Sequence, residues 1–221
     1  MSATIATAER PWVQEMIVVH RVFRRESQNL HDLIGAVRPG DTARAARLAG
    51  LAREYIEGLH GHHTSEDELL WPKLLARVDL DAELVLRMEQ QHQTVDAGLQ
   101  EVQRGLDAWE RSPAEPERDA LVAALARHRR DLLLHLDEEE RQVLPLIHEH
   151  ITAAEWAELG EHARTKTPKD KLLFMLGALL EDATPEERTR FLALLPLPAR
   201  VLWKLIGKRS YDKQMREIRN P

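Results

Sequence analysis

The chain has 221 residues, of which 43% are hydrophobic and 31% are charged, and its formal net charge is -6 at pH 7. This acidic balance argues against a general nucleic-acid binder, which needs a basic surface. The chain has no cysteine, which excludes disulfides, thiolate zinc sites, iron–sulfur clusters and covalent attachment of haem. A metal site in this chain would have to use histidine and carboxylate ligands.

The first residues, MSATIATAERPW, have neither the basic segment nor the apolar segment of a secretory signal. The longest apolar run lies near LLFMLGALL and is far shorter than the roughly 18 residues that span a bilayer. We therefore expect a cytoplasmic protein without a transmembrane segment.

Turn residues and helix caps divide residues 10–150 into four expected helices. In chain order they cover about 10–37, 41–75, 79 or 81 to 111, and 112–150. Four helices of this length with short connections predict an all-α fold, an antiparallel up-and-down four-helix bundle. The alternation that is typical of strands is nowhere sustained.

Local signals give the expected ends of these helices. Asp41 is a candidate N-cap, and Ser112 with Glu115 has the spacing of a capping box, although Pro116 leaves that start open. Pro72 and Pro145 are each expected to end or kink a helix.

After residue 150 the pattern predicts shorter helices, a C-terminal extension over 151–221 that packs on the bundle. Thr152, Thr167 and Thr184 each have an acid three residues later, as at a helix start, and a last helix is expected around 198–207. The stretch ARVLWKLIGKR is amphipathic and basic. It suits a subunit contact, as in a homodimer, or a membrane surface, or packing on the bundle with a solvated basic face.

Two stretches of the chain repeat one pattern, H-x-x-x-E-[DE]-x-x-x-x-P, in HHTSEDELLWP and HLDEEERQVLP. The aligned pairs are His62 with His135, Glu66 with Glu139, Asp67 with Glu140, and Pro72 with Pro145. Residues i and i+4 of a helix lie about 40° apart around its axis and about 6 Å apart along it. Each repeat therefore places its histidine and its glutamate on one face.

Two such faces in a bundle core would bring two imidazoles and two carboxylates together, and one carboxylate from each side can bridge two metal ions. The other two helices each add a histidine, His20 in the apolar MIVVHRVF and His92 in MEQQHQTVD. The predicted metal ligands are His20, His62, Glu66, His92, His135 and Glu139. Imidazole and carboxylate donors suit iron, although manganese or zinc can occupy similar ligands.

Each of these features has a simpler interpretation when it is taken alone. A single histidine inside a helix is usually packed or on the surface, and acid-rich stretches such as EDE and DEEE are usually solvated. The same pattern in the second and fourth helices, with a histidine in both remaining helices, favours a metal site.

The order of the motifs, and the text HRVFRR, HHTSEDELLWP, QQHQTVD and HLDEEERQVLP, resembles the hemerythrin-like, or HHE cation-binding, family over about residues 10–150. The resemblance implies a non-haem di-iron centre, with a bridging oxo or hydroxo species, inside a four-helix bundle. It implies that His20 and His62 bind one iron, that His92 and His135 bind the other, and that Glu66 and Glu139 bridge. Ferritin-like di-iron bundles differ, because they use Glu-x-x-His.

The chain departs from the oxygen-carrying members on the third helix, where they have His-x-x-x-His and this chain has His92-x-x-x-Asp96. It looks like the branch with one histidine fewer, which argues against simple reversible oxygen carriage. Asp96 is interpreted as an extra ligand or as an acceptor that orients a ligand. His128, two turns before His135, is expected to orient a ligand, to contact a substrate or to pack in the core.

The remaining histidines are not expected to bind metal. His63 is rotated by about 100° from His62 on a helix, and it is therefore not expected to be a ligand. The others, which have no matching partner, are His31, His60, His148, His150 and His162.

Three functions are compatible with this pattern. The first is a di-iron protein that binds, senses or detoxifies dioxygen, nitric oxide or peroxide, with peroxidase-like or catalase-like turnover as its enzymatic form. The second is a di-iron oxidase or oxygenase that acts on a small organic substrate. The third is a structural or regulatory bundle whose metal stabilises the fold or reports the iron level.

Overall fold

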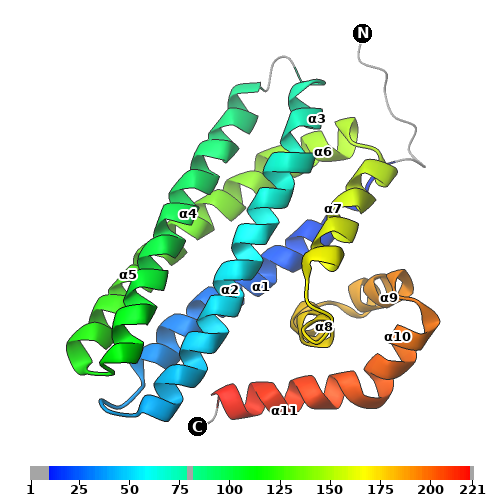
Figure 1. The fold of residues 1–221 in the computed structure, drawn as a ribbon. Helices are drawn as coiled ribbons and strands as arrows, with labels where there is room; N and C mark the ends of the chain where they lie inside the picture. The colour runs from blue at the N-terminus through cyan, green and yellow to red at the C-terminus, as the bar shows by residue number, and fades with distance from the viewer. Residues whose placement is uncertain (1–9, 79–81, 220–221) are drawn as a thin grey trace. The chain divides into compact units, whose positions relative to one another are not determined.

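The computed structural model describes residues 10–78 and 82–219, and within these ranges the chain is helical and contains no strand (Figure 1). The expected all-α fold is therefore confirmed. The chain divides into two compact units, and each is described by itself. Of the described residues, unit 1 comprises 10–13, 23–78 and 82–163, and unit 2 comprises 14–22 and 164–219.

Four long helices correspond to the four that the sequence predicts. They are α1 (Gln14–Gly35), α2 (Thr42–Leu69), α4 (Ala82–Arg111) and α5 (Glu115–Glu138). Unit 1 contains α1 from Phe23 onward and all of α2, α4 and α5, and Figure 1 shows α4 running alongside α2 and α5. The expected start of the third helix at Asp79 or Asp81 lies outside the described residues.

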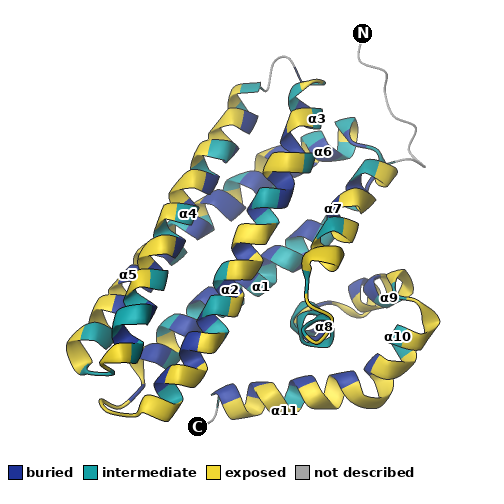
Figure 2. Cartoon of the chain, in the orientation of Figure 1, coloured by how far each residue is buried: buried dark blue, intermediate teal, exposed yellow. Residues whose placement is uncertain are grey.

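The inward faces of these helices carry apolar residues at helical spacing, and Figure 2 shows the buried residues as stripes along them. On α4 the buried residues are Val85, Met88, His92, Val95, Leu99, Val102, Leu106 and Trp109. A spacing of three or four residues keeps such a stripe on one side of a helix. His92 therefore occupies a core position among apolar neighbours.

Both repeats are followed by an interruption of the helix, as their prolines predict. The α2 helix ends at Leu69, and a short helix α3 (Trp71–Leu75) with Pro72 in its first turn follows. After α5 the chain forms a π-helical turn η2 (Glu139–Val143) and then α6 (Leu144–His150), which carries Pro145 in its first turn. Such π turns occur mostly as single turns within α-helices, frequently at functional sites.

The predicted caps are confirmed at three helix starts. Asp41 accepts a hydrogen bond from the amide of Arg44, and Thr184 forms a complete capping box with Glu187. Thr152 and Glu155 hydrogen-bond to each other's amides, immediately before α7 (Ala153–Lys166).

Two predicted caps are wrong. The α5 helix has Ala114 as its N-cap with no side-chain bond, because Pro116 lies in its first turn and Ser112 is two residues too early. Thr167 caps no helix, since α8 begins only at Leu172, after Lys171.

Unit 2 contains the first nine residues of α1, the end of α7 and the C-terminal helices. The latter are α8 (Leu172–Glu181), α9 (Pro185–Leu194), α10 (Leu197–Leu202), the π-helical turn η3 (Trp203–Gly207) and α11 (Lys208–Arg219). The last predicted helix, around 198–207, is thus part of a longer helical segment. Its buried face consists of Trp203, Gly207, Tyr211, Met215 and Ile218.

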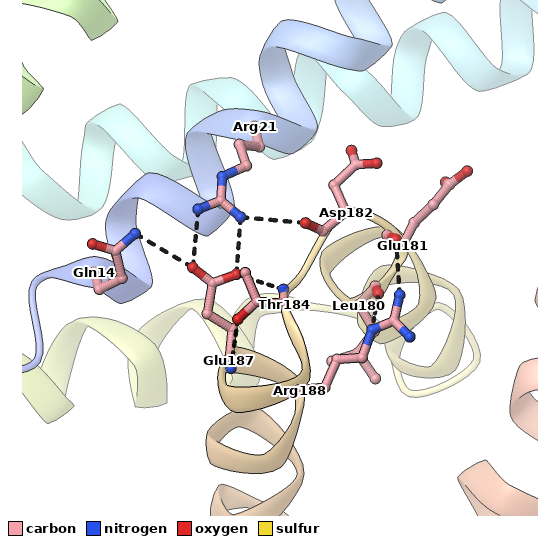
Figure 3. Close-up of polar contacts among 8 residues, drawn as sticks. All are labelled: Gln14, Arg21, Leu180, Glu181, Asp182, Thr184, Glu187 and Arg188. Atoms are coloured by element: carbon pink, nitrogen blue, oxygen red, sulfur yellow. Dashed lines mark hydrogen bonds and ion pairs between the residues drawn. The ribbon is translucent and has the colours of Figure 1, made fainter.

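A buried glutamate at the start of α9 connects α9 to α1 within unit 2 (Figure 3). The Arg21 guanidinium donates two hydrogen bonds of 2.9 Å to the Glu187 carboxylate, and Gln14 donates a third of 3.3 Å. Arg21, the capping amide of Thr184 and Gln14 together hold the pKa of Glu187 below its ordinary value. The contact fixes the first turns of α1 against α9.

None of the described helices combines the length with the apolar content that crossing a membrane requires.

We predict that Gly177→Ala destabilises the protein by about 1–3 kcal/mol, because the added methyl group would overlap the ring of Tyr211. The matched control is Gly50→Ala on α2, where no atom lies within 4 Å of the added group. There the better helix propensity of alanine should raise stability slightly. Denaturant unfolding, followed by circular dichroism, measures both, and equal effects of the two substitutions would contradict the packing of α8 against α11.

Candidate metal centre

The centre of the site is Glu66, which is completely buried near the end of α2. Its Oε1 lies 3.7 Å from Nε2 of His62, and its Oε2 lies 3.5 Å from Nε2 of His92. Two donor atoms that bind one ion at about 2.1 Å each are expected roughly 3–4 Å apart. Each oxygen of one carboxylate therefore faces a different imidazole, from α2 on one side and α4 on the other.

The second repeat forms an equivalent pair. His135 on α5 and Glu139, the first residue of the π turn, are both completely buried, and Nε2 of His135 lies 3.6 Å from Oε2 of Glu139. The expectation that i and i+4 place a histidine and a glutamate on one face agrees with the geometry at both repeats.

The buried Glu66 carboxylate is suited to bind a cation. Neither of its oxygens, nor Nε2 of His92, has a hydrogen-bond partner among the described residues, and all three atoms are shielded from solvent. Burial raises the pKa of Glu66 well above its ordinary value, and the nearby charge of Glu139 raises it further. An ionised carboxylate without donors is costly inside a protein. A bound metal ion would give these oxygens and the facing imidazole a partner, so the donor set fits a metal.

Hydrogen bonds on the far side of two rings orient them. Nδ1 of His92 donates to Oδ1 of Asp67 at 2.7 Å, and Nδ1 of His135 donates to Oε1 of Gln91 at 3.1 Å. With the proton on Nδ1, the lone pair of each ring is on Nε2, which faces a glutamate. Acceptors of this kind fix the tautomer and the orientation of histidines that bind metals.

His63 lies at the site, although the sequence does not place it among the predicted ligands. Its ring is stacked on that of His92 with centroids 4.1 Å apart, and it meets the edge of the His135 ring at 4.9 Å. Ring nitrogens of His63, His92 and His135 lie within 4.8 Å of one another. The rotation of 100° from His62 moves the ring toward these two histidines because they lie beside α2.

Asp96 is not placed among these donors. Its Oδ1 accepts a hydrogen bond of 2.8 Å from Nδ1 of His60, whose side chain is 61% exposed. The role of Asp96 as a ligand or as a ligand's acceptor stays a prediction. Its short side chain is held at the surface by a histidine of α2, and Asp67 is the acceptor that orients His92 instead.

His128 is buried two turns before His135 on α5 and hydrogen-bonds to Tyr55 on α2. Its Nε2 and the Tyr55 hydroxyl share a hydrogen bond of 2.7 Å. Burial lowers the pKa of His128 to about 4, so that the imidazole is neutral at pH 7. The structure thus pairs His128 with a tyrosine that the sequence pattern did not indicate.

His20 is completely buried on α1, in the part of the helix that belongs to unit 2. Phe23, one turn later, lies in unit 1 with its ring centroid 5.2 Å from that of His62. His20 is thus a buried residue of α1, as the sequence predicts. The role of His20 as a metal ligand stays a prediction.

Three residues at the site were missed by sequence reasoning: Asp67, Gln91 and Tyr55. Asp67 had a signal, since an acid follows the glutamate in both repeats. Gln91 and Tyr55 had none, because their roles arise from contacts between helices that are distant in sequence.

Among known protein families, the chain matches the model described as the hemerythrin HHE cation-binding domain, over residues 13–147. This match covers more than half of the chain. No curated protein and no solved structure matches the chain.

We predict that Asp67→Ala weakens metal binding by about 10–100-fold, because His92 loses the acceptor that holds its tautomer and orientation. The matched control is Asp96→Ala, which removes an aspartate from a surface hydrogen bond and should leave the affinity unchanged. Competition with a chromophoric chelator measures both affinities. An equal loss in the two variants would contradict the assignment of Asp67 as the orienting acceptor.

We predict that the titration of His128 lowers the free energy of unfolding of the metal-free protein as the pH falls from about 6.5 to about 4. His128 has a lowered pKa in the folded state, so the unfolded chain binds its proton first and gains stability over this window. The loss from this residue approaches about 3 kcal/mol below pH 4.

The His128→Gln variant keeps an acceptor for Tyr55 without titrating, and its unfolding free energy should therefore fall less over the same window. Denaturant unfolding with a chelator present, at pH 7, 5.5 and 4, measures the difference. Identical pH profiles for the two proteins would show that His128 is not buried in its neutral form.

Proposed function

Because the chain belongs to the hemerythrin family of HHE cation-binding domains, we propose that it is a non-haem di-iron protein. We propose that its centre binds, senses or detoxifies dioxygen, nitric oxide or peroxide. The observation that carries the proposal is the buried Glu66 carboxylate, whose two oxygens face imidazoles on two different helices. Within residues 10–78 and 82–219, neither oxygen has a hydrogen-bond donor. A carboxylate in this position is suited to bridge two ions.

The proposed ligands are those that the repeats indicate: His20, His62, Glu66, His92, His135 and Glu139. His92 and His135 would bind one iron, His20 and His62 would bind the other, and Glu66 and Glu139 would bridge. The facing atoms of Glu66 with His62 and His92, and of Glu139 with His135, support this division. For His20 the support is the order of the motifs and its position on α1, one turn before Phe23.

Iron is the proposed metal because imidazole and carboxylate donors together suit it, although manganese and zinc compete for such sites. A bound iron pair supplies reversible attachment or redox turnover of a small ligand. The chain keeps the imidazoles oriented through Asp67 and Gln91. Trp71, completely buried with its ring 5.8 Å from His92, and Phe23 beside His62 provide apolar surroundings that exclude water.

The low exposure of the side chains proposed to bind metal favours a small molecule as the partner of the metal centre. The side chain of His62 is 12% exposed, whereas those of Glu66, His135 and Glu139 are completely buried. Access from solvent is therefore expected beside His62. A diatomic molecule or peroxide needs little room, whereas the alternative function, a di-iron oxidase or oxygenase, needs a cavity for an organic substrate beside the same ligands.

The reactions of iron-loaded protein with dioxygen, nitric oxide and peroxide separate these functions. A charge-transfer band that changes reversibly with dioxygen or nitric oxide indicates binding or sensing, and rapid loss of peroxide indicates peroxidase-like or catalase-like activity. Iron that responds to none of the three ligands would contradict the proposal. The cytoplasmic location and the homodimer remain predictions from the sequence.

We predict that His135→Ala lowers the bound iron from two ions per chain to one or fewer and weakens the charge-transfer band. The reason is that a completely buried imidazole facing Glu139 is lost. Iron analysis of protein purified without oxygen, with an optical spectrum, measures both effects. The exposed His60→Ala is the control and should keep two irons, whereas two irons retained by the His135 variant would show that the ligand assignment is wrong.

A further inference from the structure

Unit 1 contains a buried tyrosine–histidine pair that the proposed ligand set does not use. Tyr55 and His128 are 7% and 1% exposed, and the Tyr55 hydroxyl and Nε2 of His128 share a hydrogen bond of 2.7 Å. The two rings meet edge to face with centroids 5.7 Å apart. Tyr55 is one of only two tyrosines in the chain, and the other, Tyr211, lies in unit 2.

The pair forms a layer of the core next to the candidate metal centre. Tyr55 precedes His62 by seven residues on α2, and His128 precedes His135 by seven residues on α5. Seven residues are about two turns, so each member lies on nearly the same face as a proposed ligand and about 10 Å from it. The Phe23 ring bridges part of this distance, with centroids 6.2 Å from Tyr55 and 5.2 Å from His62.

The hydrogen bond provides a path for the phenolic proton. Burial lowers the pKa of His128 to about 4, so its imidazole is neutral at neutral pH. In the tautomer with the proton on Nδ1, its Nε2 carries a lone pair and can accept the proton of Tyr55. Burial also raises the pKa of Tyr55, which disfavours a bare phenolate. An electron can therefore leave this tyrosine most easily when the proton leaves with it, across the 2.7 Å hydrogen bond.

Trp71 is the other oxidisable side chain beside the site, and its surroundings differ. Its ring is 5.8 Å from that of His92, but its buried Nε1 has no hydrogen-bond partner among the described residues. An oxidised indole would have no acceptor for its proton there. The closer ring is thus the poorer donor of an electron together with a proton.

We propose that Tyr55 is a one-electron donor to the metal centre and that His128 accepts its proton. The inference rests on the proposed function, because the oxidant is a peroxide that is reduced at the metal pair. The O–O bond of peroxide breaks with two electrons and two protons from solvent, which gives two waters. If one of these electrons came from a bound metal held by the proposed ligands, Tyr55 would supply the other: its O–H bond breaks, and an N–H bond forms on His128.

The products on the chain are a neutral tyrosyl radical and an imidazolium, hydrogen-bonded to each other. This step lets the centre complete a two-electron reduction without oxidising its own histidine ligands. The radical then returns to tyrosine by taking one electron from an external reductant, such as a thiol, and the proton back from His128.

The test mixes iron-loaded protein with hydrogen peroxide, freezes it rapidly and records the electron paramagnetic resonance spectrum. We expect a tyrosyl radical in the native protein and in Tyr211→Phe, and its loss in Tyr55→Phe. In His128→Gln the amide oxygen can still accept the hydrogen bond but is too weak a base to take the proton. We expect the radical to be lost there too, whereas a merely structural role for His128 would leave it intact.

Iron content, helical circular dichroism and melting temperature are measured first for every variant, so that a failure to fold is recognised. If the native protein binds no iron, the proposed function itself fails. If iron is bound and peroxide is consumed but no tyrosyl radical forms, or if the radical persists in Tyr55→Phe, only the inference about Tyr55 is overturned. A tryptophanyl signal that persists in Tyr55→Phe would assign the donor role to Trp71.

Discussion

The arrangement of unit 1 depends on one unfavourable feature, the completely buried Glu66 carboxylate, for whose oxygens the described residues provide no hydrogen-bond donor. In a core without metal, Glu66 would have to bind a proton or disturb the packing around it, because an isolated buried charge is strongly unfavourable. The imidazoles that face its two oxygens lie on α2 and α4. A pair of bound cations would neutralise the Glu66 carboxylate and join α2 to α4 through His62, Glu66 and His92. This is the simplest reason for a glutamate at this position.

The backbone near the site is shaped to present these ligands. Each His-x-x-x-Glu repeat ends where its helix is interrupted, at Leu70 before Pro72 and at the π turn before Pro145. Proline has no amide N–H to donate the backbone hydrogen bond that a regular α-helix needs, so the helix ends or widens near it. The π turn begins at Glu139 itself, so the widening coincides with the residue that faces His135.

Sequence reasoning reached the fold and the repeated pairs because both depend on helical periodicity, which is a local property of the chain. It failed where the outcome depends on which helices are neighbours. The rotation of about 100° between His62 and His63 follows from helix geometry. Only the packed structure shows that this rotation places the His63 ring beside those of His92 and His135. Asp96 was chosen by analogy of spacing, whereas in the fold its partner is His60, an exposed residue of α2.

The most direct test of the central claim is a crystal structure of the iron-loaded protein, with anomalous scattering recorded at the iron edge. The account predicts two iron peaks on either side of the Glu66 carboxylate, one beside His62 and the other beside His92. A single peak, or iron bound only at surface carboxylates with Glu66 making no metal contact, would contradict it.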